Sequence, residues 1–218
     1  MDAESPIVIY HSFEPKYAEV FCRLLEERFR ERGGRREIEF RWQEAASSAW
    51  GTDAEICDDT EHEIGDICCC DLPTMIKLYY LTGNVGKISP FIDTDNVFPA
   101  LLEQCRIKWD VCGIPVLMSA GSAEGTAAGQ AEGLRTFFAF MNHSYGLKRL
   151  DCLDLMNLMT DSDFLFDVCR ACNEGDITPY VFPADRTACA RLAGKEPGYA
   201  AVFDILEKPE KRDGSNND

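Results

Sequence analysis

Short apolar runs of strand length alternate along this chain with longer segments whose apolar residues recur at helical spacing. Three such runs, at 7–10, 67–72 and 114–120, consist almost entirely of β-branched, sulfur-containing and other apolar residues. An amphipathic stretch at 17–29, with apolar positions at i, i+3, i+4 and i+7, follows the first run and ends before two glycines. Regular alternation of strand and helix is typical of a doubly wound parallel sheet with helices on both faces. The sequence therefore predicts an α/β fold of about five parallel strands.

The remaining segments fit the same alternation. Residues 37–42 alternate polar and apolar, which predicts a half-buried peripheral strand. Asp95 and Asn96 precede a predicted helix whose inner face extends from Phe98 to Trp109. The other predicted elements are a helix at 134–141, a last strand at 147–155, a helix at 161–173 capped by Ser162 or Asp163, and a closing helix at 199–206.

The length of 218 residues predicts one domain, which we place at 1–206. Residues 207–218 form a charged tail that we expect to be disordered. Residues 43–65 are small, polar and acidic without a period, and are predicted to form a long loop.

The charge balance limits the classes of partner. The chain has 22 Lys and Arg against 38 Asp and Glu, a formal net charge of -16. A surface this acidic repels phosphate backbones and anionic lipid, so we expect neither a nucleic-acid nor a membrane partner. The start of the chain does not have the pattern of a signal peptide, and an odd count of 11 cysteines cannot pair completely. We therefore expect a cytoplasmic protein.

In an open parallel sheet, ligands bind at the carboxyl ends of the strands, where the strand order reverses. This rule directs attention to three loops, at 11–17, 73–84 and 119–130. The second loop follows the run 66–72 and contains Pro73-Thr74 and Gly83-Asn84, and the third begins with Ser119-Ala120-Gly121.

These motifs resemble the NADPH-dependent FMN reductases and the flavodoxin-like quinone reductases of the tryptophan-repressor-binding-protein type. In those families an Asp opens a strand that ends in Pro-Thr or Pro-Val, and an aromatic-Gly-Asn stretch leads to a helix ending in Phe-(Leu/Ile)-Asp. The corresponding residues here are Asp66, Pro73-Thr74, Gly83-Asn84 and Phe91-Ile92-Asp93, and the resemblance covers roughly 6–155. It implies a flavodoxin-like fold.

The resemblance also implies a function. Electrons would pass from NAD(P)H through FMN to a quinone or similar small acceptor, and the protein would position the flavin without a catalytic residue of its own. Relatives of this type often dimerise across the flavin, so a homodimer is among the expectations. The implied flavin and phosphate contacts are Ser12, Lys16, Pro73, Thr74, Met75, Gly83, Asn84, Ser119, Ala120 and Gly121.

Two departures from that pattern favour an alternative. The first loop contains Glu14-Pro15, which places a negative charge and removes an N–H where a phosphate would bind. An apolar insertion at 76–82 interrupts the second loop. A flavodoxin-like module that has lost its flavin and acts as an acidic protein-interaction module is therefore the second hypothesis.

Cysteines and an acidic stretch raise two further possibilities. Cys169 and Cys172 have the spacing of a redox or metal pair, but buried thiols on a helix are the simpler interpretation. The three consecutive cysteines at 68–70 alternate between the two faces of a strand and are interpreted as filling its core. The acidic stretch at 58–63 does not have the spacing of a calcium loop and is interpreted as solvated, so no metal site is predicted.

Overall fold

The structure is a computed structural model. It describes residues 5–43, 65–83, 85–88, 91–120, 134–142, 150–174, 180–195 and 197–207. Most of the predicted loop at 43–65, the glycine-containing loop after Ala120 and the charged tail after Glu207 lie outside these described residues.

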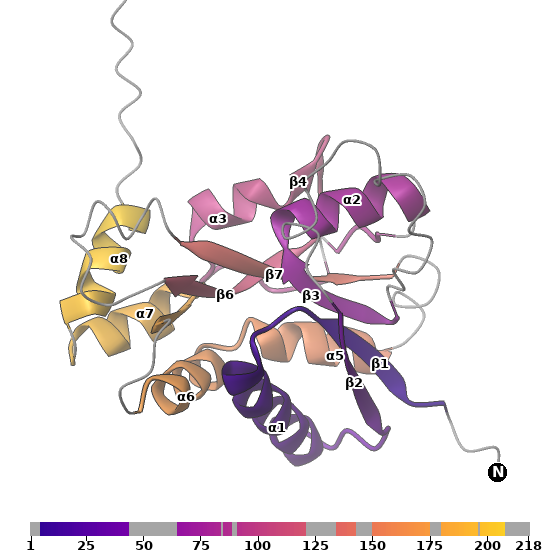
Figure 1. Ribbon diagram of the computed structural model, residues 1–218, viewed down its shortest axis with the longest axis horizontal. Helices are drawn as coiled ribbons and strands as arrows, with labels where there is room; N and C mark the ends of the chain where they lie inside the picture. Colours follow the sequence, from indigo (N-terminus) through magenta and orange to yellow (C-terminus); the bar gives the residue numbers. More distant parts are fainter. Residues whose placement is uncertain are drawn as a thin grey trace, which may run out of the picture.

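Six strands form one mixed sheet in the order β2-β1-β3-β7-β6-β8 (Figure 1). The strands of this sheet are β1 (Ile7–His11), β2 (Ile38–Trp42), β3 (Ile67–Asp71), β6 (Ile114–Ala120), β7 (Arg135–Met141) and β8 (Tyr180–Pro183). β1 pairs in parallel with β2 and β3, whereas β7 runs antiparallel to both β3 and β6, and β8 runs antiparallel to β6. A separate two-stranded hairpin joins β4 (Arg106–Ile107) to β5 (Asp110–Val111).

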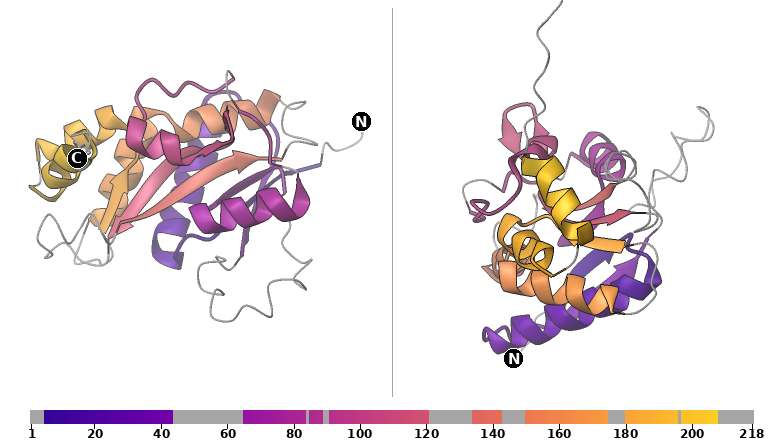
Figure 2. Two further views of the ribbon diagram at one scale, coloured as in Figure 1. Left: turned by 90° about the horizontal axis from the view of Figure 1, so that it is seen from above. Right: turned by 90° about the vertical axis from the view of Figure 1, so that its left-hand side faces the viewer.

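Helices cover both faces of this sheet (Figures 1 and 2). On one face α2 packs against β3 and β7, and α3 packs against β6. On the other face α1 packs against α5 and α6, while α7 and α8 pack together beside β8. The bounds are α1 (Pro15–Glu31), α2 (Leu72–Thr82), α3 (Pro99–Gln104), α5 (Leu150–Met159), α6 (Ser162–Asn173), α7 (Arg186–Ala193) and α8 (Pro197–Glu207).

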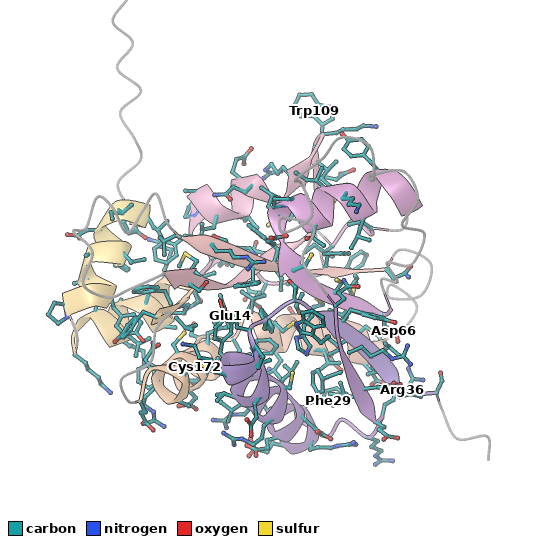
Figure 3. All side chains as sticks on the ribbon, in the orientation of Figure 1. Glu14, Phe29, Arg36, Asp66, Trp109 and Cys172 are labelled. Carbon is teal, nitrogen blue, oxygen red and sulfur yellow. The ribbon has the colours of Figure 1, made fainter. Side chains whose placement is uncertain are left out.

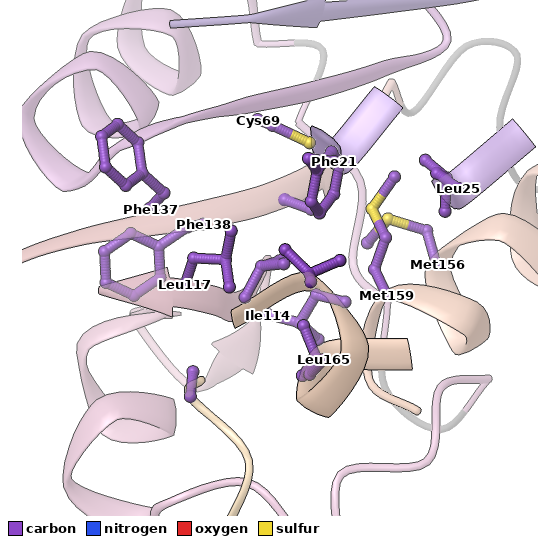
Figure 4. Packing of buried hydrophobic residues seen from close by; sticks show 14 of the residues in the cluster. Phe21, Leu25, Cys69, Ile114, Leu117, Phe137, Phe138, Met156, Met159 and Leu165 are labelled. Carbon is purple, nitrogen blue, oxygen red and sulfur yellow. The ribbon is translucent and has the colours of Figure 1, made fainter. Parts of the chain in front are cut away.

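The core lies between the sheet and the α1, α5 and α6 layer, and continues under α2. Phe21 and Leu25 of α1 meet Met156 and Met159 of α5 above the sheet (Figure 4). All three cysteines of β3 are fully buried, which agrees with their interpretation as core residues. Burying a phenylalanine, leucine or methionine side chain stabilises the fold by about 1.5–3 kcal/mol.

The prediction of a doubly wound, all-parallel flavodoxin-like sheet is wrong. The sheet has six strands, and β7 runs antiparallel between β3 and β6. β3 and β6 run in the same direction, but β7 lies between them in the opposite direction, so the sheet is mixed rather than doubly wound.

The error traces to residues 134–141, which were predicted to form a helix and instead form β7. Leu134, Phe137, Phe138 and Met141 do have helical spacing, but the segment is also a continuous apolar run. In the middle of a sheet covered on both faces, both sides of a strand are buried, so the period of two disappears. The last five residues of β7 are all buried, which is the pattern of such a central strand.

A second exchange of strand for helix follows in the chain. Residues 147–155 were predicted to form a strand, but α5 begins at Leu150. Its buried residues Cys152, Leu155, Met156 and Met159 follow the helical spacing i, i+3, i+4 and i+7.

The predicted helix from Phe98 to Trp109 is also too long. α3 ends at Gln104, and the chain then turns through the β4–β5 hairpin. The side chain of Trp109 at the hairpin turn is 92% exposed, instead of belonging to an inner face. Lys108 adopts a positive φ of 61°, which turns the chain at this point.

Candidate functional site

The strand directions bring several polar side chains to one edge of the sheet. β1, β3 and β6 end at this edge, and β7 begins there because it runs antiparallel to its neighbours. We call this edge, with the residues that follow or open those strands, the carboxyl edge. Its polar residues are Ser12, Glu14, Tyr17, Asp71, Thr74, Ser119 and Arg135.

Ser12 follows β1 directly and is 7% exposed. Its backbone N–H donates to the carbonyl of Cys69 at 3.0 Å, which extends the β1–β3 pairing by one residue. Its side-chain Oγ is buried and makes no hydrogen bond with any described residue. A buried hydroxyl without a partner costs about 1–3 kcal/mol of stability. The packing of the core therefore does not account for a serine at this position.

Tyr17 presents a second buried hydroxyl from the first turn of α1. Its ring packs against Phe13 and Phe137, with ring centroids 6.2 Å apart in each case. Side-chain hydrogen bonds with Ser119 and Glu14 reach this hydroxyl. Burial, together with the charge of Glu14 and its hydrogen bond, raises the pKa of Tyr17 to about 12, so the phenol is protonated at neutral pH. Ser119 and Arg135 also lie close enough to the Tyr17 hydroxyl to affect that pKa.

Asp71 is the buried anchor of the edge. Its Oδ1 accepts hydrogen bonds from the backbone N–H and the hydroxyl of Thr74, which caps the first turn of α2. Its Oδ2 accepts from the Arg135 guanidinium at 3.1 Å. The Asp71 side chain is 5% exposed and that of Arg135 is 37% exposed, so the pair bridges the core and the surface.

Arg135 is held in place from two further directions. Its guanidinium lies 4.9 Å from the centre of the Phe137 ring. In the sheet, Arg135 pairs with Ser119 of β6, and Phe137 pairs with Asp71 of β3. Residues paired in register, or two apart on one strand, share a face of the sheet. Asp71, Ser119 and Arg135 therefore lie on the face that α1 covers.

The start of α1 adds charge to this group. Glu14 occupies the N-cap position and its side chain makes no capping hydrogen bond, while Pro15 opens the helix. Figure 3 shows Glu14 at the end of α1 that meets the sheet. Asp71 and Arg135 neutralise each other, and Glu14 and Lys16 bring one negative and one positive charge from the start of α1. The arrangement offers hydroxyl, carboxylate and guanidinium groups to a small polar molecule.

The structure brings some of the predicted site residues together and separates others. Ser12, Thr74 and Ser119 lie at the carboxyl edge, and Ala120 ends β6 there. Lys16 is the second residue of α1, and its charge lowers the pKa of Cys172 of α6, although burial dominates and raises that pKa to about 12.

The rest of the predicted second loop is a helix. Pro73, Thr74 and Met75 belong to the first turn of α2, where Met75 is fully buried and Pro73 is exposed. Gly83 follows the other end of α2, about 15 Å from Pro73 at the rise of a helix. Its φ is 63°, which glycine adopts readily. Asn84 and Gly121 lie outside the described residues.

Three residues of the edge were not predicted. From the sequence, Tyr17 was interpreted as an apolar-face residue of a helix. Asp71 was interpreted as the end of an apolar strand. Arg135 belonged to a segment predicted to be helical. A polar residue at the carboxyl end of a buried strand was a signal that could have identified Asp71.

The comparisons with known proteins concern the fold. The sequence matches no protein-family model and no curated protein. Among solved structures, the chain is similar to thiaminase I from Clostridium botulinum in complex with thiamin, at a TM-score of 0.65 and 12% identity, over 94% of this chain and 92% of that one. It is also similar to thiaminase I from Bacillus thiaminolyticus, at 0.59 and 11%, with the same coverage. A third similar structure is a Thermus thermophilus maltotriose-binding protein bound with maltotriose, at 0.60 and 8%, covering 92% and 86% of the two chains.

The fold is that of thiaminase I and the solute-binding proteins. The resemblance to FMN reductases and flavodoxin-like quinone reductases is therefore wrong, because both the mixed sheet and the solved structures point to this other fold. The expected transfer of electrons from NAD(P)H through FMN is likewise not supported, and neither is its alternative, a flavodoxin-like module without flavin. At these identities the likeness shows the fold alone.

The cysteines of the described residues are not placed to react. The cysteines described are buried or half-buried, including Cys169 and Cys172, and burial raises the pKa of Cys69, Cys70 and Cys169 well above the ordinary value. Such thiols are protonated at neutral pH and are poor nucleophiles.

Within the described ranges, no helix combines the length and the apolar character that spanning a membrane requires.

His11 gives a pH dependence that can be tested. The imidazole ends β1, is 8% exposed and stacks on Phe13 with centroids 5.7 Å apart. Burial lowers the pKa of His11, and its Nδ1 makes no hydrogen bond with the described residues. Below the unfolded pKa of about 6.5, the unfolded chain binds a proton that the folded chain does not. We therefore expect stability to fall as the pH drops below that value, until it passes the lowered pKa.

The measurement is urea unfolding of the wild type and of His11→Asn, at pH values of about 7.5 and about 5.5. The wild type should lose more unfolding free energy between these two pH values than His11→Asn does. Equal losses in the two proteins would show that other groups account for the pH dependence.

Proposed function

We propose that this protein binds a small polar solute at the carboxyl edge of its sheet. The observation that carries the proposal is the buried hydroxyl of Ser12, which has no hydrogen-bond partner among the described residues. A bound solute would supply that partner.

The neighbouring groups support this proposal because they are held in place in advance. The Asp71 carboxylate orients Arg135, and the guanidinium packs over the Phe137 ring. A site whose polar groups are fixed before binding loses less conformational entropy when the ligand arrives. Solved structures of the same fold hold thiamin and maltotriose, which makes solute binding a function that this fold can perform.

The charges favour one class of solute. The Asp71–Arg135 pair is neutral, and the whole chain has a net charge of -16. Hydroxyl groups and a positive charge on the ligand match these residues, whereas a multiply charged anion does not. The proposed ligand is therefore a hydroxylated solute that is neutral or cationic.

The first test is a binding screen with the purified protein. Thiamin and maltotriose represent a cationic and a neutral hydroxylated solute, and citrate represents an anion of similar size. Calorimetric titration should detect binding of a cationic or neutral compound, and not of citrate. Binding of citrate alone would contradict the proposal.

The variants Ser12→Ala and Tyr17→Phe test the two hydroxyls. Each should weaken binding of the solute found in the screen by about tenfold, because each removes one hydrogen bond to it. Without ligand, Ser12→Ala should be as stable as the wild type or more stable, since it removes a buried hydroxyl without a partner.

Tyr80→Phe is the matched control. Tyr80 is 74% exposed on α2, and the change removes the same atom. It should leave binding unchanged. If Ser12→Ala instead lowered the stability of the free protein by more than about 1 kcal/mol, the Ser12 hydroxyl would have a structural partner and the proposal would lose its support.

A further inference from the structure

A polar cleft opens near the edge of the sheet opposite the carboxyl edge. It has a volume of about 530 Å³, within the range of pockets that hold small molecules. Arg32, which follows the far end of α1, lines one side of it. α1 has 17 residues, so this end lies about 25 Å from the carboxyl edge. We call this pocket the amino-edge cleft.

Four segments far apart in the sequence form the walls of the cleft. They are the end of α1, the chain at 93–97, the turn from α5 into α6, and α7. Every lining residue except Val97 is polar. Amide and hydroxyl groups face it from Asn96, Asn157, Thr160, Ser162 and Thr187. A polar lining of this kind provides orientation for a hydroxylated molecule rather than apolar burial.

Hydrogen bonds fix these walls relative to one another. Asn157 Oδ1 accepts from the backbone N–H of Asp93 at 3.1 Å, which ties the end of α5 to the 93–97 segment. The carbonyl of Asn96 accepts from the N–H of Arg186 at 2.7 Å, and the hydroxyl of Thr187 donates to Asn96 Oδ1 at 3.4 Å. The cleft is therefore bounded by segments that are bonded to each other.

Both arginines that line the cleft form ion pairs with aspartates that also line it. Arg32 pairs with Asp161 at 2.6 Å, and Arg191 pairs with Asp163 at 2.5 Å. Asp161 also caps α6, with its Oδ1 accepting from the N–H groups of Asp163 and Phe164. Because this helix N-terminus is already bonded to a carboxylate, it offers no site to an anion.

Asp93 is the acidic residue of the cleft wall that these two ion pairs do not include. Its Oδ1 accepts from the backbone N–H of Asp95 at 3.0 Å, and the described residues place no Lys or Arg in an ion pair with it. We propose that the amino-edge cleft binds a small hydroxylated solute that carries an ammonium group, with Asp93 as the counter-charge. This site is separate from the carboxyl edge and does not depend on the function proposed there.

The test uses three sugars that differ mainly in charge. Glucosamine carries an ammonium group, glucose is neutral and glucuronate is anionic. Each is titrated into the isotope-labelled protein, and the side-chain amide signals of Asn96 and Asn157 are followed by NMR. Glucosamine should shift both signals in a saturable way and at lower concentration than glucose, and glucuronate should not shift them.

Two charge-removing variants separate a specific site from general attraction to an acidic protein. Asp93→Asn keeps the shape of the wall and should weaken glucosamine binding by about tenfold. Glu19→Gln makes the same change of net charge on the exposed side of α1, about 20 Å along the helix from Arg32, and should leave binding unchanged.

The outcomes decide the proposal in either direction. Equal weakening by Asp93→Asn and Glu19→Gln would mean non-specific attraction, and stronger binding of glucuronate would mean an anion site. Either result, or the absence of any shift at the two asparagines in the wild type, would overturn the proposal. Ser12→Ala should leave the glucosamine shifts intact, which distinguishes this cleft from the carboxyl edge.

Discussion

Replacing Phe137 with alanine should remove a large part of the stability of this protein. Phe137 lies in the middle of β7, is fully buried, and makes edge contacts with Phe13 and Tyr17 at 5.1 and 6.2 Å between ring centroids. It also supports the Arg135 guanidinium. Truncating a buried phenylalanine of this kind costs about 3–5 kcal/mol, compared with a typical total of about 5–15 kcal/mol.

The measurement is chemical unfolding of Phe137→Ala beside Trp109→Ala. Trp109 is 92% exposed at the β4–β5 hairpin, well away from Glu14 in Figure 3. Removing its side chain should change the unfolding free energy by less than about 0.5 kcal/mol. A cost below about 1 kcal/mol for Phe137→Ala would show that residues 135–141 do not form the central strand of the sheet.

The second large effect is expected at Asp71. Asp71→Ala removes the acceptor of three hydrogen bonds, from the Thr74 N–H, the Thr74 hydroxyl and Arg135. Thr74 is 1% exposed, so its two donors would remain buried without that acceptor. We expect a loss on the order of 3 kcal/mol, to which the uncapped start of α2 also contributes.

Glu27→Ala provides the comparison for Asp71→Ala. Glu27 pairs with Arg23 at 3.2 Å on the surface of α1, with about half of each side chain exposed. Losing such a pair costs about 0.3–0.5 kcal/mol. If unfolding experiments gave similar losses for the two variants, Asp71 would be an ordinary surface acid rather than the anchor of the carboxyl edge.

The two proposed sites put different demands on the fold. At the carboxyl edge, the buried Ser12 hydroxyl carries an energetic cost that a ligand would offset, so removing it should raise stability and lower affinity. At the amino-edge cleft the polar groups already bond to one another, so Asp93→Asn should change binding with little effect on stability. This contrast lets one set of variants report on both sites.

Several elements could be read directly from residue patterns. β1, α1, β3, β6 and α8 form within a few residues of their predicted bounds, because each strand is a short apolar run and each helix has a clear helical period. The start of α6 was predicted within one residue, but its cap was placed one or two residues too late, since Asp161 and not Ser162 or Asp163 is the cap. Local signals of this kind act over a few residues and therefore survive in the sequence.

The central part of the fold was not readable in this way. The apolar run at 134–141 satisfies both a helical period and a fully buried strand, and only the neighbours β3 and β6 decide between them. The segment after Asp71 was predicted to be a loop because of Pro73, although proline is well tolerated in the first turn of a helix. These two errors together produced the wrong sheet and the wrong family.

The site shows the same division. Ser12, Thr74 and Ser119 could be placed at strand ends from the sequence, because loops after buried strands are recognisable. Tyr17 and Arg135 could not, since their proximity depends on α1 folding back over the sheet and on β7 running antiparallel.

The sequence by itself determined the local elements with strong periods, the burial of the cysteines and the acidity of the surface. The tertiary structure alone decided the direction of β7, and with it which polar groups meet at the carboxyl edge. The physical reason is that strand direction and pairing depend on contacts between residues far apart in the chain. Hydrophobic pattern specifies which residues are buried, but not which strand they lie beside.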